Sequence, residues 1–443
     1  MPENYFSRLL FRPVDIAPLV FFRLVFGLLM AIESIGAIFI GFVHEAYIEP
    51  QFHFSYLLFH WIEPLPGQGM VYLYILMTIL SLMIMAGWWY RTACALFFIC
   101  FSYGFLIEKA HYINHHYLAI LISFVLIFLP ANRYFSLDVK FNPSLKQKVI
   151  PYWPVFLLAS QMAVVYIFGG FAKVNPDWLA ALSIKHWFSF KTDYFIIGPL
   201  LGLDISPWIF AYGGVLFDLL IVPAMIWSRT RMTAFFIAIF FHFLNLVVFH
   251  IGIFPFMAIA LTALYFPASS FRKWMFPSTE PVRLTDYQTA VNFSRPALMF
   301  CILWLIIQVA VPLRPYFYNE DPQWTEKGHR FAWRMMLRAK SGHITFFVDT
   351  EDDTKTIVPS DYLTSSQARN VPTRPDMVYQ MGHFLKQHYI EKGEVVTAVR
   401  AEGHLSLNGR DAMPFIDPSY DLTEEPWQKC SLPEWVITRE KMQ

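Results

Sequence analysis

The feature that most constrains the fold of this chain is a series of long apolar segments. A helix that crosses a bilayer needs about 20 mostly apolar residues. Only 15% of the residues are charged, against roughly 25% in soluble domains. The sequence therefore predicts a polytopic α-helical membrane bundle of about nine spans. The candidate spans are 15–43, 69–88, 91–108, 114–131, 152–173, 208–228, 232–250, 251–267 and 295–313.

Lysine and arginine in the short loops predict the orientation of this bundle. They concentrate in the loops on the side of the N-terminus, with Arg91, Arg133 and Arg229 among them. The loop over 44–68, on the opposite side, contains glutamates and no lysine or arginine. Positive residues favour cytoplasmic loops. We therefore expect the N-terminus inside and the C-terminal domain outside.

The composition changes near residue 313, so we divide the chain into a membrane domain, 1–313, and an outer domain, 314–443. Segments 344–350, 354–359 and 395–407 are rich in β-branched and aromatic residues and partly alternate, which predicts strands. Residues 375–392 have the periodicity of one amphipathic helix. We expect the outer domain to be soluble and mostly β.

Charge and cysteine content exclude some classes of function. The formal net charge is only +1, so no overall basic field indicates a nucleic-acid partner. Three of the four cysteines lie in apolar segments, and no CxxC pair is present. The sequence therefore predicts neither a disulfide framework nor a cysteine metal site.

Ionisable residues inside predicted spans are costly and are therefore functional candidates. Asp15, Arg23 and Glu33 lie in the first segment, where we favour an internal ion-pair network that fixes helix packing. The fourth segment opens with His115 and His116. These histidines either belong to a functional site or form a cluster at the membrane interface. Adjacent helical residues point about 100° apart, so these two histidines do not easily face one metal ion.

Two further segments carry polar residues near the same membrane face. Lys173 follows Gly169-Gly170, and it either extends to the interface or is a desolvated general base. His242 and Asn245 lie one helical turn apart on one face. They either belong to a functional site or form hydrogen bonds between helices. Because all these residues are expected at one depth beside the outer domain, they suggest one site.

Five motifs, in order along the chain, resemble the vitamin K-dependent gamma-glutamyl carboxylase family. The resemblance extends to its bacterial-type members with the horizontally transferred transmembrane domain. INHHYL, YIFGGFAKVNPDW and FHFLNLVVFHIGIFP carry it in the membrane domain, and WRMML (333–337) and SLNGRDAMPFIDPSYDL (406–422) carry it in the outer domain. Five ordered motifs are far more specific than any one of them.

The resemblance implies an enzyme of the carbon–carbon lyase class. Such an enzyme oxidises vitamin K hydroquinone with dioxygen to the epoxide and couples this reaction to carboxylation of peptide glutamate. The implied cofactor is reduced phylloquinone or menaquinone, with O2 and CO2 as co-substrates and no metal. The implied partners are the lipid bilayer, a glutamate-containing peptide or protein, and a quinone reductase for recycling.

The resemblance also implies roles for single residues. Lys173 is the implied base that starts hydroquinone oxidation, and His115 assists proton handling, oriented by Asn114. The other residues implied to bind quinone or substrate are Tyr166, His242, Asn245, Trp333, Met335 and Met336.

Arg334 and Arg338 stand where we expect an aspartate and a histidine in the animal members. They are four residues apart and would share one side of either a helix or a strand. Guanidinium groups pair with carboxylates through two hydrogen bonds, so we expect a clamp for a substrate carboxylate. A structural ion pair is the alternative.

Two other functions stay open: a vitamin K hydroquinone epoxidase without carboxylation, and a transporter or export partner that uses these residues as a proton relay. We see no repeated half that would favour a transporter. The short tail, the lack of a cysteine in 44–68 to pair with Cys430, and a single sequon at Asn292 on the predicted inner side favour the bacterial inner membrane over the endoplasmic reticulum.

Overall fold

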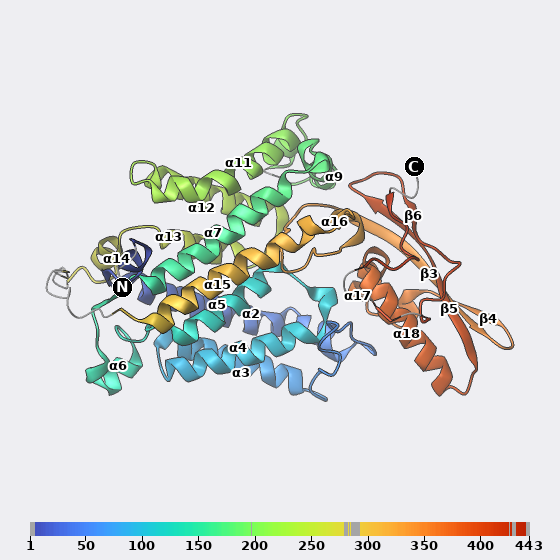
Figure 1. The fold of residues 1–443 in the computed structure, drawn as a ribbon. Coiled ribbons are helices and arrows are strands. Elements are labelled where there is room, and N and C mark those ends of the chain that lie inside the picture. The colour runs from blue at the N-terminus through green and yellow to red at the C-terminus, as the bar shows by residue number, and fades with distance from the viewer. Residues whose placement is uncertain are drawn as a thin grey trace.

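The computed structural model describes residues 5–195, 197–278, 282, 284, 293–424, 426–427 and 431–439. A helical bundle forms one end of the molecule, and a unit containing a β-sheet forms the other (Figure 1). We call the end of the bundle that meets this unit the domain end. Cys430 and Asn292, on which two expectations rest, lie outside the described residues.

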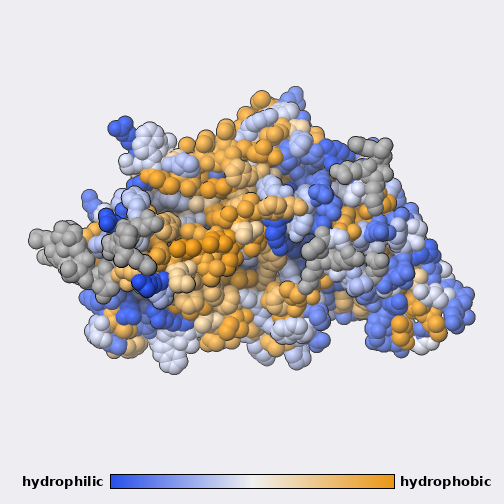
Figure 2. Space-filling model, viewed as in Figure 1, coloured by the Kyte–Doolittle hydropathy of each residue, from blue (hydrophilic) through white to orange (hydrophobic). Residues whose placement is uncertain are grey.

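Each predicted span contains a helix, so the prediction of a helical membrane bundle is confirmed. Seven described helices are long and apolar enough to cross a membrane. The face of the bundle seen in Figure 2 is largely apolar, with polar surface toward both ends, as expected for an integral membrane protein. The principal helices are α2 (Ala17–Phe39), α3 (Gly69–Ala86), α4 (Tyr90–Ile107), α5 (Asn114–Phe128), α7 (Trp153–Lys173), α11 (Ser206–Ile226), α12 (Arg231–Phe249), α13 (Phe254–Ala263) and α15 (Arg295–Leu313).

Two predicted spans are shorter than a full crossing. Helix α5 has 15 residues, and α13 has 10. Helix α13 reaches spanning length only with α14 (Ala268–Met275), to which it is bent by 112°. Of the described helices, up to eight therefore count as spans, against the predicted nine.

The chain between α12 and α13 is unwound. His250 and Gly252 have φ angles of +53° and +59°, in the left-handed region that ends helices. The α-helix resumes only at Phe254. The near-continuous apolar sequence over 232–267 is thus divided into two helices, as predicted, and the unwound segment 250–253 separates them.

Short elements tie the helices together. Strand β1 (Pro13–Asp15) pairs antiparallel with β2 (Val149–Pro151), so α2 and α7 begin at the same end of the bundle. The remaining short helices are α1 (Tyr5–Leu10), α6 (Leu137–Phe141), α8 (Pro176–Leu179), α9 (Leu182–Ser189) and α10 (Gly198–Leu201).

The three charged residues of the first span do not form one network. Asp15 pairs with Arg272 of α14, with Nη2 to Oδ1 at 2.7 Å. Arg23 donates a hydrogen bond to the Ala131 carbonyl at 2.8 Å. Glu33 lies 2.8 Å from Nε2 of His116. Each side chain joins a different part of the chain, so the predicted role in helix packing is met by separate contacts and not by one network.

The C-terminal unit contains an antiparallel sheet in the order β4–β3–β5–β6. The predicted strands and the predicted helix are confirmed, and β6 is a further short strand. The elements are β3 (Lys340–Thr350), β4 (Thr354–Ile357), β5 (Val396–Leu407), β6 (Met413–Ile416), α16 (Pro322–Thr325), α17 (Ser365–Asn370) and α18 (Pro375–Glu391). Phe346 and Val399 of the sheet and Leu385 of α18 are fully buried in its core, so the sheet and α18 share one apolar interface.

Polar contacts hold this unit on the domain end of the bundle. Lys109, between α4 and α5, pairs with Asp376 at the start of α18 at 2.8 Å. Arg410 donates two hydrogen bonds of 2.6 Å to Asp177 of α8. These pairs join the unit to two different parts of the bundle, the α4–α5 connection and α8.

Candidate functional site

A cavity of about 710 Å³ lies where the bundle meets the C-terminal unit. Helices α5, α7, α11 and α12 and the unwound segment 250–253 form its membrane part. Residues 326–338, which we call the covering loop, close it from the C-terminal unit. This volume is within the usual range for a pocket that holds a small organic molecule.

Nearly all the residues predicted for the site line this cavity. They come from three helices, α5, α7 and α12, and from the covering loop, so the polar clusters of separate spans do meet. Trp333 of the covering loop is the exception. Its side chain is fully buried and packs against Tyr117, with the two ring centres 5.1 Å apart. The predicted residues in the lining are Asn114, His115, Tyr166, Lys173, His242, Asn245, Arg334, Met335, Met336 and Arg338.

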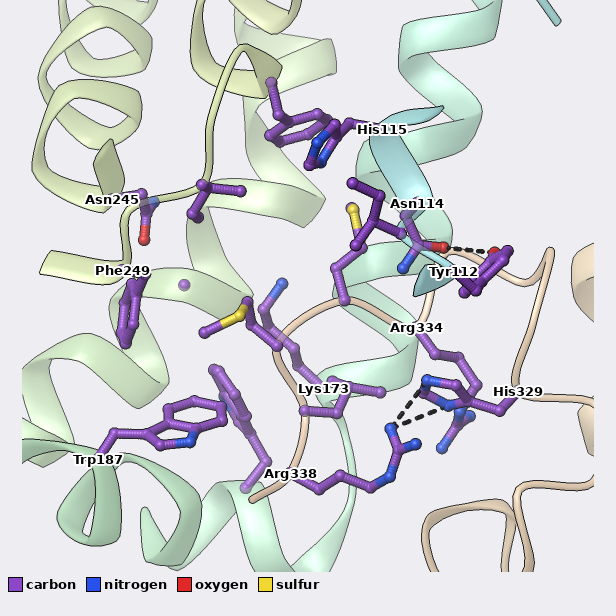
Figure 3. A pocket seen from close by; sticks show the side chains of 18 of the residues that line it. Tyr112, Asn114, His115, Lys173, Trp187, Asn245, Phe249, His329, Arg334 and Arg338 are labelled. Carbon is purple, nitrogen blue, oxygen red and sulfur yellow. Dashed lines mark hydrogen bonds between the residues drawn. The ribbon is translucent and has the colours of Figure 1, made fainter. Parts of the chain in front are cut away.

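The cavity has two chemically different sides. Trp187 of α9 and Phe249 of α12 lie on one side (Figure 3). His329, Arg334 and Arg338 lie on the opposite side, with Lys173 between the two groups. One cavity thus presents an apolar aromatic wall and a cationic wall to whatever it binds.

Lys173, the last residue of α7, is 8% exposed. Its Nζ contacts Oδ2 of Asp218, a buried residue of α11, and lies 5.6 Å from the centre of the Trp178 ring. The side chain therefore does not extend to water, as it would if Lys173 reached the membrane interface. Sequence reasoning missed Asp218, although it is the acidic residue within segment 208–228 and intramembrane acids are functional candidates.

Glycines allow Lys173 and Asp218 to meet. A Cβ atom added at Gly170 would lie 2.7 Å from the Leu219 side chain, and one at Gly169 would lie 3.3 Å from Oδ2 of Asp218. Small residues let membrane helices approach closely. The Gly169-Gly170 pair thus places α11, and with it Asp218, against the end of α7.

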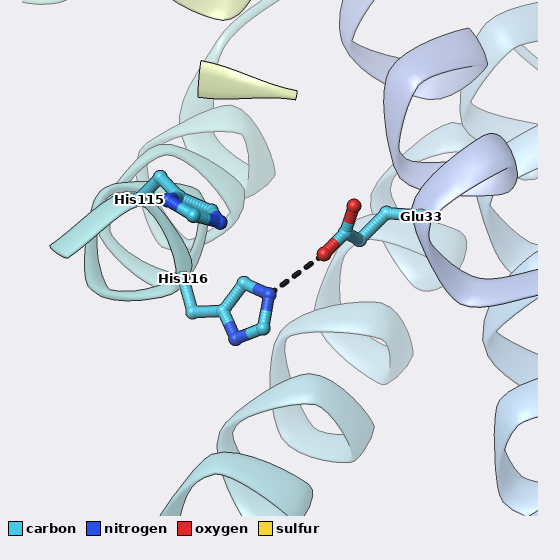
Figure 4. Close-up of side chains that lie close together, drawn as sticks. All are labelled: Glu33, His115 and His116. Atoms are coloured by element: carbon cyan, nitrogen blue, oxygen red, sulfur yellow. Dashed lines mark hydrogen bonds and ion pairs between the residues drawn. The ribbon is translucent and has the colours of Figure 1, made fainter. Parts of the chain in front are cut away.

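His115 and His116 have different surroundings. His115 lines the cavity, and the structure gives its ring nitrogens no hydrogen-bond partner among the described residues. His116 instead bonds to Glu33 of α2 (Figure 4). The ligand atoms of Glu33, His115 and His116 nevertheless lie within 4.8 Å of one another, closer than we expected for adjacent histidines. The absence of a metal stays a prediction.

The other polar residues of the cavity are held by specific partners. The Tyr112 hydroxyl donates to Oδ1 of Asn114 at 3.0 Å, so Asn114 is fixed by Tyr112; no described hydrogen bond joins it to His115. The Tyr166 hydroxyl lies 2.7 Å from Nε2 of His242. Asn245 donates to the Phe241 carbonyl at 3.0 Å.

The covering loop has an irregular backbone. Phe331, Trp333 and Met336 have positive φ angles of 65°, 55° and 49°, which non-glycine residues adopt only where their surroundings require it. The segment WRMMLRAK is therefore neither a helix nor a continuous strand. Our argument that regular spacing places Arg334 and Arg338 on one face does not apply, although both line the cavity.

The two arginines differ in their partners. Arg338 bonds to both carboxylate oxygens of Glu326 and, at 2.8 Å, to Nε2 of His329. Burial alone would raise the pKa of Glu326, but Arg338 and Lys340 hold it well below its usual range. Glu326 and His329 were not predicted, because they lie in no motif that we used.

Arg334 is buried at 7% exposure. Its Nε has no partner, and none of the described hydrogen bonds or ion pairs involves its guanidinium. Burial lowers the pKa of this group. A buried cation without a partner is costly, so Arg334 is suited to bind an anion that enters the cavity.

Comparison with known families agrees with the motifs of the sequence. Residues 11–269 match the HTTM domain family. Residues 294–442 match the family described as vitamin K-dependent gamma-carboxylase, lumenal domain. The first match alone covers more than half of the chain. No solved structure matches the chain.

Proposed function

Because the chain belongs to the vitamin K-dependent gamma-carboxylase family, we propose that it couples oxygenation of vitamin K hydroquinone to the epoxide with carboxylation of peptide glutamate. It would then act as a carbon–carbon lyase. The observation that carries this proposal is the two-sided cavity, in which Lys173 lies between an aromatic wall and a cationic wall. One wall suits a quinone and the other suits a carboxylate.

The aromatic side of the cavity fits a hydroquinone. Trp187, Phe210 and Phe249 offer flat apolar surface for a naphthalene ring. Asn245 donates to Phe241 through Nδ2, so its Oδ1 is available to accept a phenolic hydrogen bond. When bound, reduced phylloquinone or menaquinone supplies, with dioxygen, the strong base that removes the γ-proton of glutamate, to which CO2 then adds.

The residues of the chain would divide the remaining tasks. Lys173 Nζ accepts a phenolic proton, and the unpaired imidazole of His115 moves a second proton beside it. The bonded Tyr166 and His242 hold the shape of the pocket, while Met335 and Met336 help to close it from the covering loop. Exclusion of water by the helices and this loop protects a strong base from being quenched.

We also propose where the protein resides. The N-terminus would be cytoplasmic and the C-terminal unit would lie outside, in the bacterial inner membrane, with the endoplasmic-reticulum membrane as the alternative. The quinone would enter from the bilayer, and a quinone reductase would regenerate it. The glutamate-containing peptide or protein would arrive from the aqueous side of the C-terminal unit.

The proposed orientation predicts opposite labelling of two exposed positions. In a background with Cys430 replaced by serine, Asn142→Cys should react with an impermeant maleimide only from the cytoplasmic side. Asp352→Cys, at the exposed end of the β3–β4 hairpin, should react only from the outside. Labelling of both from one side would contradict the orientation drawn from the loop charges.

The function is tested with purified protein in lipid nanodiscs. A vitamin K hydroquinone, labelled CO2 and a short glutamate peptide are supplied, and the epoxide and the fixed label are measured separately. Formation of both products supports the carboxylase. Epoxide without fixed label would leave an epoxidase, and neither product would overturn the proposal.

Arg334→Gln should weaken peptide use without removing epoxide formation. Hydrogen bonds to charged groups contribute about 1.5–3 kcal/mol, so we expect the peptide KM to rise roughly 10- to 100-fold. Peptide-independent epoxide formation should remain near the wild-type rate. The measurement is carboxylation as a function of peptide concentration.

Arg338→Gln is the matched control. It leaves Glu326 without its main partner, so thermal stability should fall and both activities should fall together. If Arg334→Gln has the wild-type peptide KM, the guanidinium does not bind the substrate carboxylate.

A further inference from the structure

Lys173 and Asp218 form a pair with few other connections. Beside the Asp218 carboxylate, Nζ of Lys173 has only the Gly169 carbonyl, at 3.5 Å, as a described hydrogen-bond partner. Among the described residues, the Asp218 carboxylate has Lys173 as its one hydrogen-bond partner. Both side chains are buried, and they come from different helices. The pair is therefore an isolated unit in apolar surroundings.

The pairing raises a chemical difficulty for the proposed base. An ammonium group has no lone pair and cannot accept a proton, and a carboxylate beside it favours the charged form. The acidic residues in the described lining of the cavity are Asp218 and Glu326, and Glu326 is bound to Arg338 and Lys340. Of these two acids, Asp218 is the one that contacts Lys173 and is placed to take its proton.

We propose that Asp218 controls the protonation state of Lys173 and receives its proton when the amine acts as a base. This inference rests on the proposed function and adds a positioning residue to that site. The proton moves from Nζ to Oδ2, and the freed lone pair of Nζ then accepts the phenolic proton. The pair begins with one transferable proton and ends with two, and one negative charge remains on the phenol oxygen. No electron is transferred.

The apolar surroundings lower the free-energy cost of moving the proton from Lys173 to Asp218. Two buried charges are poorly solvated, so the neutral arrangement of amine and carboxylic acid competes with the ion pair. The Gly169-Gly170 pair holds the two helices at the distance that the transfer needs. Other titratable groups in the described lining of the cavity include Tyr166, His242, His115 and Arg334, from α7, α12, α5 and the covering loop.

The test is the pH dependence of Lys173 itself. Asp218→Asn keeps the shape of the side chain but can neither carry the negative charge nor take the proton. Without a counter-ion, a buried lysine loses its proton at lower pH. The midpoint for acylation of Lys173 by a small lipid-soluble reagent, followed by mass spectrometry, should move down by about one pH unit or more, which is tenfold more free amine at a given pH.

Controls separate this effect from simple damage. The exposed Lys185 of α9, measured in the same digest, should keep its midpoint. Asp218→Ser serves as a second variant should the asparagine protein not fold. In the active enzyme, the rate of peptide-independent epoxide formation is also measured as a function of pH. The acid limb of this pH profile should move in the same direction as the Lys173 midpoint.

The outcomes are distinct. An unchanged Lys173 midpoint in folded Asp218→Asn protein would overturn the inference. The labelling needs no catalysis, so a wild-type protein that forms no epoxide would overturn the proposed function and leave the Lys173–Asp218 result to stand on its own.

Discussion

Replacing Lys173 with alanine is expected to abolish epoxide formation while the protein still inserts in the membrane. The amine is the proposed acceptor of the phenolic proton, and a positioned acid or base typically contributes 10²- to 10⁴-fold to a rate. We expect a loss of at least about 10³-fold, because the other lysine in the described lining of the cavity, Lys340, is paired with Glu326. The measurement is epoxide formed per minute with peptide absent.

This variant leaves Asp218 buried without its cation. The carboxyl can take a proton and become neutral, so stability should fall but the fold should persist. The double variant Lys173→Ala/Asp218→Asn also removes the buried carboxyl group. It should therefore regain stability and remain equally inactive. Lys185→Ala, which removes an exposed lysine from the same end of the bundle, should retain full activity. Wild-type rates in Lys173→Ala would exclude the lysine as the base.

His115→Ala should reduce both activities by about 100-fold or more, the scale of a lost proton-transfer group. The imidazole lines the cavity and has no described hydrogen-bond partner, so it is free to exchange a proton with bound molecules. Rates of epoxide formation and of CO2 fixation, both measured at saturating hydroquinone, provide the check.

The neighbouring histidine is the matched control. His116 bonds to Glu33 of α2 and does not line the cavity. His116→Gln, which can still donate a hydrogen bond to Glu33, should keep activity within a few-fold of wild type. Equal and mild losses at both positions would instead indicate that the two histidines stabilise the interface of α5 and α2.

Much of the architecture could be predicted from the sequence, because the relevant signals are local. The apolar segments marked the long helices of the bundle, since burial in lipid requires continuous apolar sequence, but they did not mark the short helices such as α9. Alternation and periodicity likewise marked β3, β5 and α18. The length of α13 could not be predicted, because apolar composition continues through the left-handed residues between α12 and α13.

The candidate residues could be named from the sequence, but their partners could not. Lys173 and Asp218 are 45 residues apart, and only the packing of α11 against Gly169-Gly170 brings them together. The irregular covering loop pairs Arg338 with Glu326, whereas Nε of Arg334 has no partner among the described residues. Two identical side chains in one motif cannot reveal this difference. The same loop turns Trp333 away from the cavity. Composition and periodicity are properties of neighbouring residues, whereas the protonation and availability of a buried charge depend on which distant groups the tertiary fold places beside it.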